Sequence, residues 1–323
     1  MHSPVTIVIP VYNRAHTIAR TLRSIDTQTL RPAHVILVDN NSSDSSVDVM
    51  RAWADGKDYV TLLSQPRAGA CAARNRGLEC VTTEWTMFFD SDDVMAPEHV
   101  SDFSRAIDSN PQADIIGRDI LTRFIDGSIR RLYFLTGRDN AMFHHLFRGC
   151  LSTQRYVART SLFRAVGAWD ENLSGWVDYE LGTRLLMHTS AILRLSGTPT
   201  VTTFQQEESI TGTGFSAHPE RWEHSLDTIR DHFLSLPDSD NRRRRWLDWL
   251  DARSMILAAA YEREALENTS HADRENYAVA HSLSTSLYAK VMQRTHHPRR
   301  QRLIYLHNLH LRRLTWLLAQ SLL

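Results

Sequence analysis

The segment Asp90-Ser91-Asp92-Asp93 is the strongest candidate for chemistry, because an apolar run leads directly into three carboxylates within four residues. Carboxylates packed this closely repel one another, and a divalent cation with oxygen ligands removes that repulsion. Proteins usually hold magnesium or manganese with one or two carboxylates together with the phosphates of a nucleotide. The segment therefore predicts a Mn²⁺ or Mg²⁺ site. The alternative is that Asp92 and Asp93 only cap a helix that begins near Pro97.

The first half of the chain must position these carboxylates, and it alternates short β-branched runs with helical patterns. This alternation is typical of βαβ units on a mostly parallel sheet. The turn Asn40–Ser43 contains serines that can cap the following helix. Strands are predicted at Val5–Pro10, His34–Asp39, Val60–Ser64 and Trp85–Asp90, and helices at Ala15–Ser24, from that turn toward Trp53, and at Ala70–Cys80.

Three polar segments follow the ends of predicted strands. They are Pro10-Val11-Tyr12-Asn13, Asp39-Asn40-Asn41 and Asp90-Ser91-Asp92-Asp93. In a parallel sheet with right-handed crossovers the carboxyl ends of the strands lie at one edge, and ligands bind in the crevice there. We therefore expect polar side chains from three distant parts of the sequence to meet at one site.

The rest of the chain predicts an insertion and then a helical part. The stretch from Ile115 to Phe163 is expected to cover an edge of the sheet, and Glu207–Ser216 reads as a polar loop. From Trp222 onward the pattern is helical, with Arg242–Arg245 read as part of a solvated connection between helices. We predict an α/β catalytic domain over residues 1–215 and an α-helical extension over residues 216–323.

Composition excludes several classes of protein. Lys plus Arg equals Asp plus Glu at 37 each, so net charge gives no reason to expect a nucleic-acid partner. The three cysteines, Cys71, Cys80 and Cys150, are an odd number without a C-x-x-C pair, which fits a reducing cytoplasm. No secretion signal precedes the first strand, and no run of about 18 apolar residues predicts a membrane-spanning helix.

Five ordered segments resemble the family 2 glycosyltransferases, which have the GT-A fold. These segments are VTIVIPVYNR, VILVDNNSSDSS, RAGACAARNRGL, FFDSDD and GAWDENLSGWVDYELGTRL, and together they cover about residues 5 to 190. The resemblance implies a Rossmann-like, mostly parallel sheet. It also implies an inverting transfer of a sugar from a nucleotide-diphosphate donor, most often a UDP-sugar, to an acceptor hydroxyl.

The resemblance also assigns roles to residues of the donor site. Arg74 is expected to contact the nucleotide, since its planar fork suits phosphate recognition, and the alternative is a surface arginine on a helix. A carboxylate at position 39 can accept the uracil ring N–H. The full donor set is Pro10 and Tyr12 for the base and ribose, Asp39 for uracil, Arg74 for the nucleotide, Asp90 for the ribose or sugar, and Asp92 for the metal, with Asp90 beside it.

An inverting transfer needs a base that removes the proton of the acceptor hydroxyl. In the family this base is the aspartate of a Glu-Asp pair before an E-L-x-x-R helix start, so the resemblance assigns it to Asp178, while Val177 replaces the glutamate. The alternative for Asp178 is a helix N-cap. Gly175 and Trp176 precede the base, and an aromatic face there could stack on an acceptor sugar or belong to the core.

Weaker signals lie elsewhere. The loop Gly212-Thr213-Gly214 could close over the donor, and His144-His145 is read as a surface pair rather than a metal site. His218, Arg221 and Trp222 weakly match the Q-x-x-R-W motif of processive members of the family.

The C-terminal segment carries seven basic residues and no acidic residue after Glu275. It could lie on an anionic membrane, pack on its own catalytic domain or contact a second subunit in a homo-oligomer. The protein is accordingly expected in the cytoplasm, either free or at the inner face of the cell membrane. The residues placed on one helical face are Leu303, Ile304, Leu306, Leu311, Leu314, Leu317, Leu318 and Leu322.

The sequence thus predicts an inverting glycosyltransferase that acts on a saccharide or lipid-linked saccharide, in polysaccharide or glycoconjugate synthesis. A nucleotidyltransferase is one alternative, but PVYNRAHT lacks the glycines that would hold a triphosphate. A non-catalytic relative that binds sugar nucleotides or glycans is the other alternative.

Overall fold

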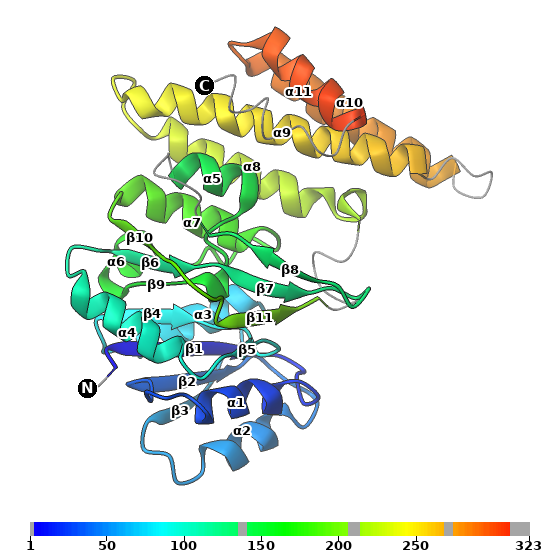
Figure 1. The fold of residues 1–323 in the computed structure, drawn as a ribbon. Helices are drawn as coiled ribbons and strands as arrows, with labels where there is room; N and C mark the ends of the chain where they lie inside the picture. The colour runs from blue at the N-terminus through cyan, green and yellow to red at the C-terminus, as the bar shows by residue number, and fades with distance from the viewer. Residues whose placement is uncertain (1–2, 135–140, 206–213, 268–273, 311–323) are drawn as a thin grey trace. The chain divides into compact units, whose positions relative to one another are not determined.

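A computed structural model describes residues 3–134, 141–205, 214–267 and 274–310 (Figure 1). The chain forms two compact units, Met1–Glu207 and Glu208–Leu323. The sequence-based boundary between residues 215 and 216 lies inside the second unit, and the functional division between the two parts stays a prediction.

The described part of the first unit contains a seven-stranded sheet in the order β10-β6-β9-β4-β1-β2-β3 (Figure 1). Every neighbouring pair in this sheet is parallel except for the two pairs made by β9. The mostly parallel α/β sheet predicted from the sequence is therefore confirmed. The strands are β1 Val5–Val11, β2 His34–Asp39, β3 Val60–Ser64, β4 Trp85–Phe88, β6 Ile115–Arg118, β9 Tyr156–Arg159 and β10 Ile192–Leu195.

The core of this unit forms around β1 and β2, whose apolar residues are buried on both faces of the sheet. Strands covered on both sides read as continuous apolar runs, as VTIVIPV and HVILVD do. The helices of the unit are α1 Ile18–Asp26, α2 Ser46–Ala54, α3 Ala70–Glu79, α4 His99–Ser109, α5 Ala141–Arg148, α6 Thr160–Ala165 and α7 Val177–His188.

The segment 115–163 does not cover a sheet edge as predicted. Strands β6 and β9 lie inside the main sheet, and β9 runs antiparallel between β4 and β6. The first three side chains of β9 are buried on both faces, and an interior position is the one that buries them. The remaining strands of this segment join a second sheet in the order β5-β11-β7-β8, made of β5 Val94–Met95, β11 Val201–Phe204, β7 Ile120–Arg123 and β8 Ile129–Leu132.

Helix α7 packs closely against α5 because residue 182 is glycine. A Cβ added at Gly182 would lie 2.5 Å from the ring of His145 and 2.9 Å from Cβ of Leu151. The His145 ring is fully buried, and its Nε2 lies 2.8 Å from the carbonyl oxygen of Tyr179. The ring therefore cannot move aside without breaking a buried hydrogen bond.

We predict that Gly182→Ala destabilises the protein by about 1–3 kcal/mol, the usual cost of overpacking a core. At an unconstrained helical position the same change stabilises by about 0.4–1 kcal/mol, since it restricts the unfolded chain. The sign of the change in thermal unfolding midpoint therefore tests the contact, and a midpoint equal to or above that of the native chain would contradict it.

The second unit is helical in its described residues, as predicted. Arg242–Arg245 is not a connection but lies within the first two turns of α9, where the Asp240 carboxylate accepts the N–H of Arg242. Helices α10 and α11 both pack against α9. The helices are α8 Pro219–Leu234, α9 Asn241–Glu267, α10 Arg274–Arg294 and α11 Pro298–His310.

The apolar residues that were predicted to share one face of the C-terminal segment differ in exposure on helix α11. Ile304 is buried with Gln301 and Asn308, whereas Leu303 and Leu306 are 60% and 41% exposed. The predicted positions from Leu311 to Leu322 lie outside the described residues. Among the described helices none combines the length and the apolar composition that crossing a bilayer requires.

Candidate active site

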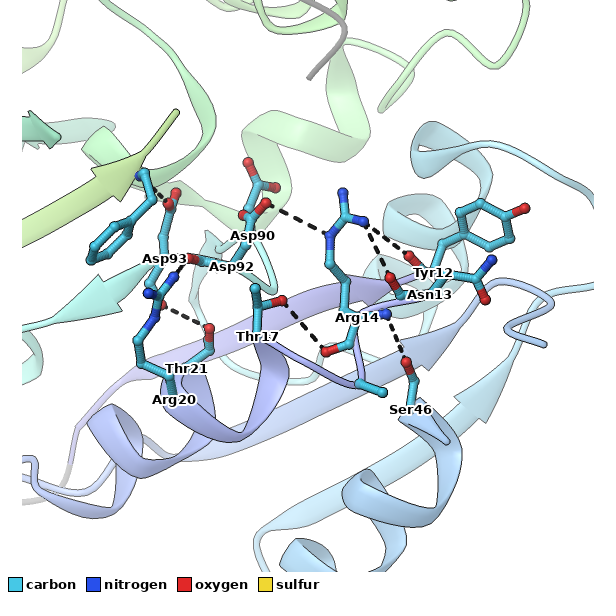
Figure 2. A network of polar contacts seen from close by, with 12 residues as sticks. Tyr12, Asn13, Arg14, Thr17, Arg20, Thr21, Ser46, Asp90, Asp92 and Asp93 are labelled. Carbon is cyan, nitrogen blue, oxygen red and sulfur yellow. Dashed lines mark hydrogen bonds and ion pairs between the residues drawn. The ribbon is translucent and has the colours of Figure 1, made fainter. Parts of the chain in front are cut away.

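The loops after β1 and β2 are bound to each other at the carboxyl edge of the sheet. The N–H of Asn13 donates to Ser42 Oγ at 3.0 Å. The N–H of Arg14 donates to Ser46 Oγ at 2.7 Å (Figure 2). The N-cap of α2 is Ser45, which makes no side-chain cap bond. Of the serines predicted to cap this helix, Ser42 accepts the N–H of Asn13 and Ser43 donates its N–H to Asn13 Oδ1, so both hold the first two polar segments together.

The three residues predicted to hold the base and ribose lie side by side at this edge. Pro10 pairs with Val38 and Val11 with Asp39 in the β1–β2 register. Tyr12 is 56% exposed, so its ring is available to a ligand. One carboxylate oxygen of Asp39 accepts the N–H of Ser42 at 3.2 Å, and the other accepts no bond from any described residue. Their roles in base binding stay predictions.

Arg74 is buried and paired with Asp90. Its Nη2 donates to Asp90 Oδ1 at 2.8 Å, and its guanidinium carbon lies 4.4 Å from the ring centroid of Trp169. The side chain is only 6% exposed, so the alternative of a surface arginine is wrong. Burial opposes its charge, yet the carboxylates of Asp90 and Asp178 raise the pKa of Arg74, which places all three residues in one electrostatic site.

Two nitrogens of Arg74, Nε and Nη1, are buried and make no hydrogen bond with the described residues. An unsatisfied buried donor costs about 1–3 kcal/mol, and more when it belongs to a charged group. Such donors beside a carboxylate at a sheet edge are suited to an anionic ligand that accepts both bonds. This is the clearest sign of a binding function in the unit.

Asp93 has a structural role: its carboxylate holds the acidic loop in place, rather than binding a metal or capping a helix. Its Oδ1 accepts the N–H of Phe204 at 3.1 Å, and its Oδ2 accepts a bond from Gln154 Nε2 (Figure 2 shows Asp93 beside Asp90 and Asp92). Burial, followed by the charges of Asp90 and Asp92, raises the pKa of Asp93 well above its ordinary value. The acidic loop is thereby attached to β11.

The side chain of Asp92 faces Arg14, and Asp92 Oδ2 lies 3.7 Å from Arg14 Nε (Figure 2). The backbone carbonyl oxygen of Asp92 accepts a hydrogen bond from Arg20 Nη2 at 2.6 Å. Burial raises the pKa of Asp92, and the charge of Asp90 adds to the effect. The N-cap of α4 is Glu98, without a side-chain cap bond, so neither Asp92 nor Asp93 caps that helix. The capping alternative is wrong.

The acidic loop fits a metal held mainly by one carboxylate. Both oxygens of Asp90 are engaged, by Arg74 and by Gln154 Nε2 at 2.6 Å, and Asp92 is paired with Arg14 at 3.7 Å. In the described residues no group of three or more His, Cys, Asp or Glu could hold an ion alone. A single carboxylate completed by diphosphate oxygens is a normal magnesium or manganese site, so ligation by Asp92, with Asp90 beside it, stays a prediction.

Asp178 lies in the first turn of α7, and the N-cap position belongs to Trp176. Its Oδ1 accepts the hydroxyl of Thr153 at 2.7 Å, and the N–H of Thr153 lies 3.4 Å from Oδ2. Burial raises the pKa of Asp178, while Arg74 and the Thr153 hydroxyl oppose the rise. The N-cap alternative is wrong, and the carboxylate is oriented by Thr153 and has a raised pKa.

The residues around Asp178 are held by an ion pair and a ring contact. Glu180 is buried and forms a two-bond ion pair with Arg184, at 2.5 and 2.6 Å. Trp176 is half-buried, its ring centroid lies 5.6 Å from that of Tyr179, and it adopts the left-handed backbone region with φ of 45°. Strained residues of this kind gather at functional sites. Gly175 is buried beside it, and acceptor binding by the pair stays a prediction.

Sequence reasoning missed the residues that connect these groups. Gln154 bonds Asp90 and Asp93, and Thr153 orients Asp178, yet both come from the segment read as an edge insertion. Their signal was weak: a Thr-Gln-Arg run directly before an apolar strand. Trp169, which faces the Arg74 guanidinium, was quoted in a family motif without a role of its own.

The weaker sequence signals have structural explanations. His144 and His145 are buried, so the predicted surface pair is wrong, and burial lowers the pKa of His145 to about 4. Trp222 is buried in the helical unit, where its Nε1 donates to the carbonyl of Phe215 at 3.1 Å. Of the loop predicted to close over the donor, residues 212 and 213 lie outside the described residues.

Comparison with known proteins identifies a protein family that the part of the chain containing most of this site matches. Residues 6–163 match the protein family described as "Glycosyl transferase family 2". An uncharacterized glycosyltransferase of Escherichia coli K12, YibD, is 36% identical over 92 residues, which are 28% of this chain and 27% of that protein. The chain thus spans less than a third of the length of this relative.

Two solved structures share the fold. S. aureus TarS 1-349 in complex with UDP-GlcNAc has a TM-score of 0.68 at 18% identity, over 99% of this chain and 92% of that one. The mannosyltransferase PcManGT from Pyrobaculum calidifontis, in complex with GDP-Man and Mn²⁺, has a TM-score of 0.55 at 18% identity, over 96% of this chain and 88% of that one. Residues 6–163 therefore form a glycosyltransferase family 2 domain, and the chain has the GT-A fold.

Proposed function

We propose that this protein is an inverting glycosyltransferase that uses a nucleotide-diphosphate sugar, with a UDP-sugar as the first candidate donor. The observation that carries the proposal is Arg74, whose two buried unpartnered nitrogens lie beside Asp90 and within the electrostatic reach of Asp178. A donor diphosphate supplies the oxygens that these nitrogens lack, and it lies where the carboxyl ends of the strands meet.

Different residues of the chain would bind different parts of the donor. Tyr12 and Asp39 are suited to the base, because Asp39 keeps one carboxylate oxygen without a described partner. Arg74 would hold the diphosphate, and Asp90 would be fixed toward the ribose or sugar by Arg74 and Gln154. Asp92 would hold Mn²⁺ or Mg²⁺, which neutralises charge on the leaving diphosphate.

Asp178 is the proposed general base. It accepts the proton of the acceptor hydroxyl while that oxygen attacks the anomeric carbon on the face opposite the diphosphate, so the configuration inverts. The Thr153 hydroxyl keeps the carboxylate aimed, and burial gives it a raised pKa that strengthens it as a base. Trp176, half-buried and two residues before the base, is the proposed stacking surface for an acceptor saccharide, free or lipid-linked.

Release of the nucleoside diphosphate tests the proposal. We expect Mn²⁺-dependent release of UDP from UDP-GlcNAc or another UDP-sugar. GDP-Man is the matched comparison, since the two similar folds are described with different donors. Release only from GDP-Man would show that the donor nucleotide is GDP rather than UDP, while the proposal of a glycosyltransferase would stand. No release from any sugar nucleotide, with binding intact, would favour the non-catalytic relative, and release of pyrophosphate from a nucleoside triphosphate would favour a nucleotidyltransferase.

We propose further that α11 contacts an anionic membrane at the cytoplasmic face. Leu303 and Leu306 are exposed on this helix, with the basic Arg299 and Arg302 exposed beside them. An apolar pair rimmed by cations is typical of helices that lie on anionic bilayers.

The double variant Leu303→Gln/Leu306→Gln should bind vesicles containing phosphatidylglycerol at least about tenfold more weakly, because two apolar side chains no longer enter the bilayer. Co-sedimentation measures this, and Leu266→Gln/Val279→Gln, at residues that are 52% and 50% exposed, is the control. Equal vesicle binding by both variants would contradict the proposal, as would a change only in oligomeric state.

A further inference from the structure

The helical unit contains a cavity of about 300 Å³ formed by the end of α8, the start of α9 and the link between α10 and α11. It includes part of the Arg242–Arg245 run, to which the proposed reaction gives no role. The lining residues are Arg230, Leu234, Asp238, Arg243, Arg244, Leu247 and His296.

The positive charges of this cavity exceed its negative charges. Arg243 is paired with Asp238, and Arg230 Nη1 donates to Asp251 Oδ1 at 2.7 Å. The same Asp251 oxygen also accepts a bond from Arg294 Nε at 3.0 Å, so one carboxylate serves two guanidinium groups.

Arg244 is exposed to solvent, and it forms no ion pair or hydrogen bond with any residue that the structure describes. Burial lowers the pKa of Arg230, although Asp251 opposes the fall, and the charge of Arg294 adds to it. The cavity therefore has one solvent-exposed guanidinium without a partner among the described residues and a second one whose carboxylate is shared, and both can pair with a bound anion.

The four arginines of the run have different surroundings. Arg242 is paired with Asp240, and Arg245 lies over the ring of Trp249, so neither lines the cavity. Only Arg243 and Arg244 do. The chain thus supplies its own control pair, with the same charge, the same helix and adjacent positions.

We infer that this cavity is a binding site for a phosphate ester, held by Arg244, Arg243 and Arg230. Guanidinium forks match the oxygens of a phosphate group. Leu234 and Leu247 form an apolar wall beside the cations, so the ligand carries an apolar part next to its phosphate. The volume suits one such group rather than a continuous nucleic-acid backbone. The inference does not depend on the proposed transfer reaction.

Calorimetric titration of the full chain with phenyl phosphate and with inorganic phosphate tests the soluble form of this ligand. We expect phenyl phosphate to bind more tightly, because its ring meets the leucines. Arg243→Gln/Arg244→Gln should weaken its binding at least about tenfold, since charge-assisted bonds are lost. Arg242→Gln/Arg245→Gln removes the same charge and should change affinity less than about twofold. Equal losses in both variants would overturn the inference.

Vesicles distinguish a lipid headgroup from a soluble phosphate ester as the source. If co-sedimentation with phosphatidylglycerol vesicles falls in Arg243→Gln/Arg244→Gln but not in the control pair, the site takes a lipid phosphate. If only phenyl phosphate binding falls, the ligand is a soluble phosphorylated compound. If neither measurement separates the two variants, while thermal unfolding shows both to be folded, the cavity is not a phosphate site.

Discussion

The variant Asp178→Asn is expected to transfer sugar about 10³-fold more slowly than the native chain, while its affinity for the nucleotide changes by less than about twofold. Asparagine has nearly the shape of aspartate and can still accept the Thr153 hydroxyl, but it cannot take a proton from the acceptor. The loss therefore falls on turnover, measured as UDP release in the presence of acceptor.

Asp48→Asn is the control for this change, because Asp48 is exposed on α2 and its ion pair with Arg51 contributes little. It should leave turnover unchanged. Near-normal transfer by Asp178→Asn would show that another group is the base, and a parallel loss of nucleotide affinity would show that Asp178 acts through the donor site.

The pH dependence of the native chain should carry the signature of the same residue. The base must be ionised, so kcat/KM falls as the pH drops through the pKa of Asp178, which burial raises above that of an ordinary aspartate. Thr153→Val removes a donor that stabilises the ionised form, so the acidic limb should move to higher pH. If the acidic limb of Thr153→Val stayed at the pH of the native chain, Thr153 would have no influence on the pKa of the base.

Changes at Arg74 should give the second large effect, and here the loss falls on donor binding. Arg74→Lys keeps the charge but loses the planar fork that reaches Asp90 and the diphosphate together. We expect nucleotide affinity to fall at least about tenfold, as titration would measure, because charge-assisted bonds to the diphosphate are lost.

Arg76→Lys is the matched control, since Arg76 lies on the same helix with an exposed pair to Glu79. It should bind nucleotide normally. If Arg74→Lys also bound normally, the two unpartnered nitrogens would have a structural origin and the proposed donor site would lose its main support.

The fold could be predicted from the sequence where the local pattern of apolar and polar residues matches the environment of the strand or helix in the structure. Strands β2 and β3 begin and end at the predicted residues, because each is a short β-branched run bounded by polar turns. The pattern could not place β9. Its antiparallel position between β4 and β6 depends on contacts with residues far away in the sequence, and periodicity carries no information on pairing order.

The site was predictable to the same extent. Residues at strand ends, such as Asp39 and Asp90, could be proposed from the sequence because topology alone brings strand ends together. Gln154 and Thr153 were missed because their function depends on where β9 enters the sheet. His145 was misread because a polar residue on a short helix looks exposed until a buried partner, the Tyr179 carbonyl, is known.

Calorimetric titration of UDP, with and without Mn²⁺, on the native chain and on Asp92→Ala tests the central claim most directly. The account predicts metal-dependent UDP binding by the native chain, and in Asp92→Ala no increase in affinity when Mn²⁺ is added, because the carboxylate predicted to bind the ion is gone. Absence of nucleotide binding by the native chain in every condition, with GDP tested in parallel, would contradict the claim and leave the family membership as shared ancestry without the donor site.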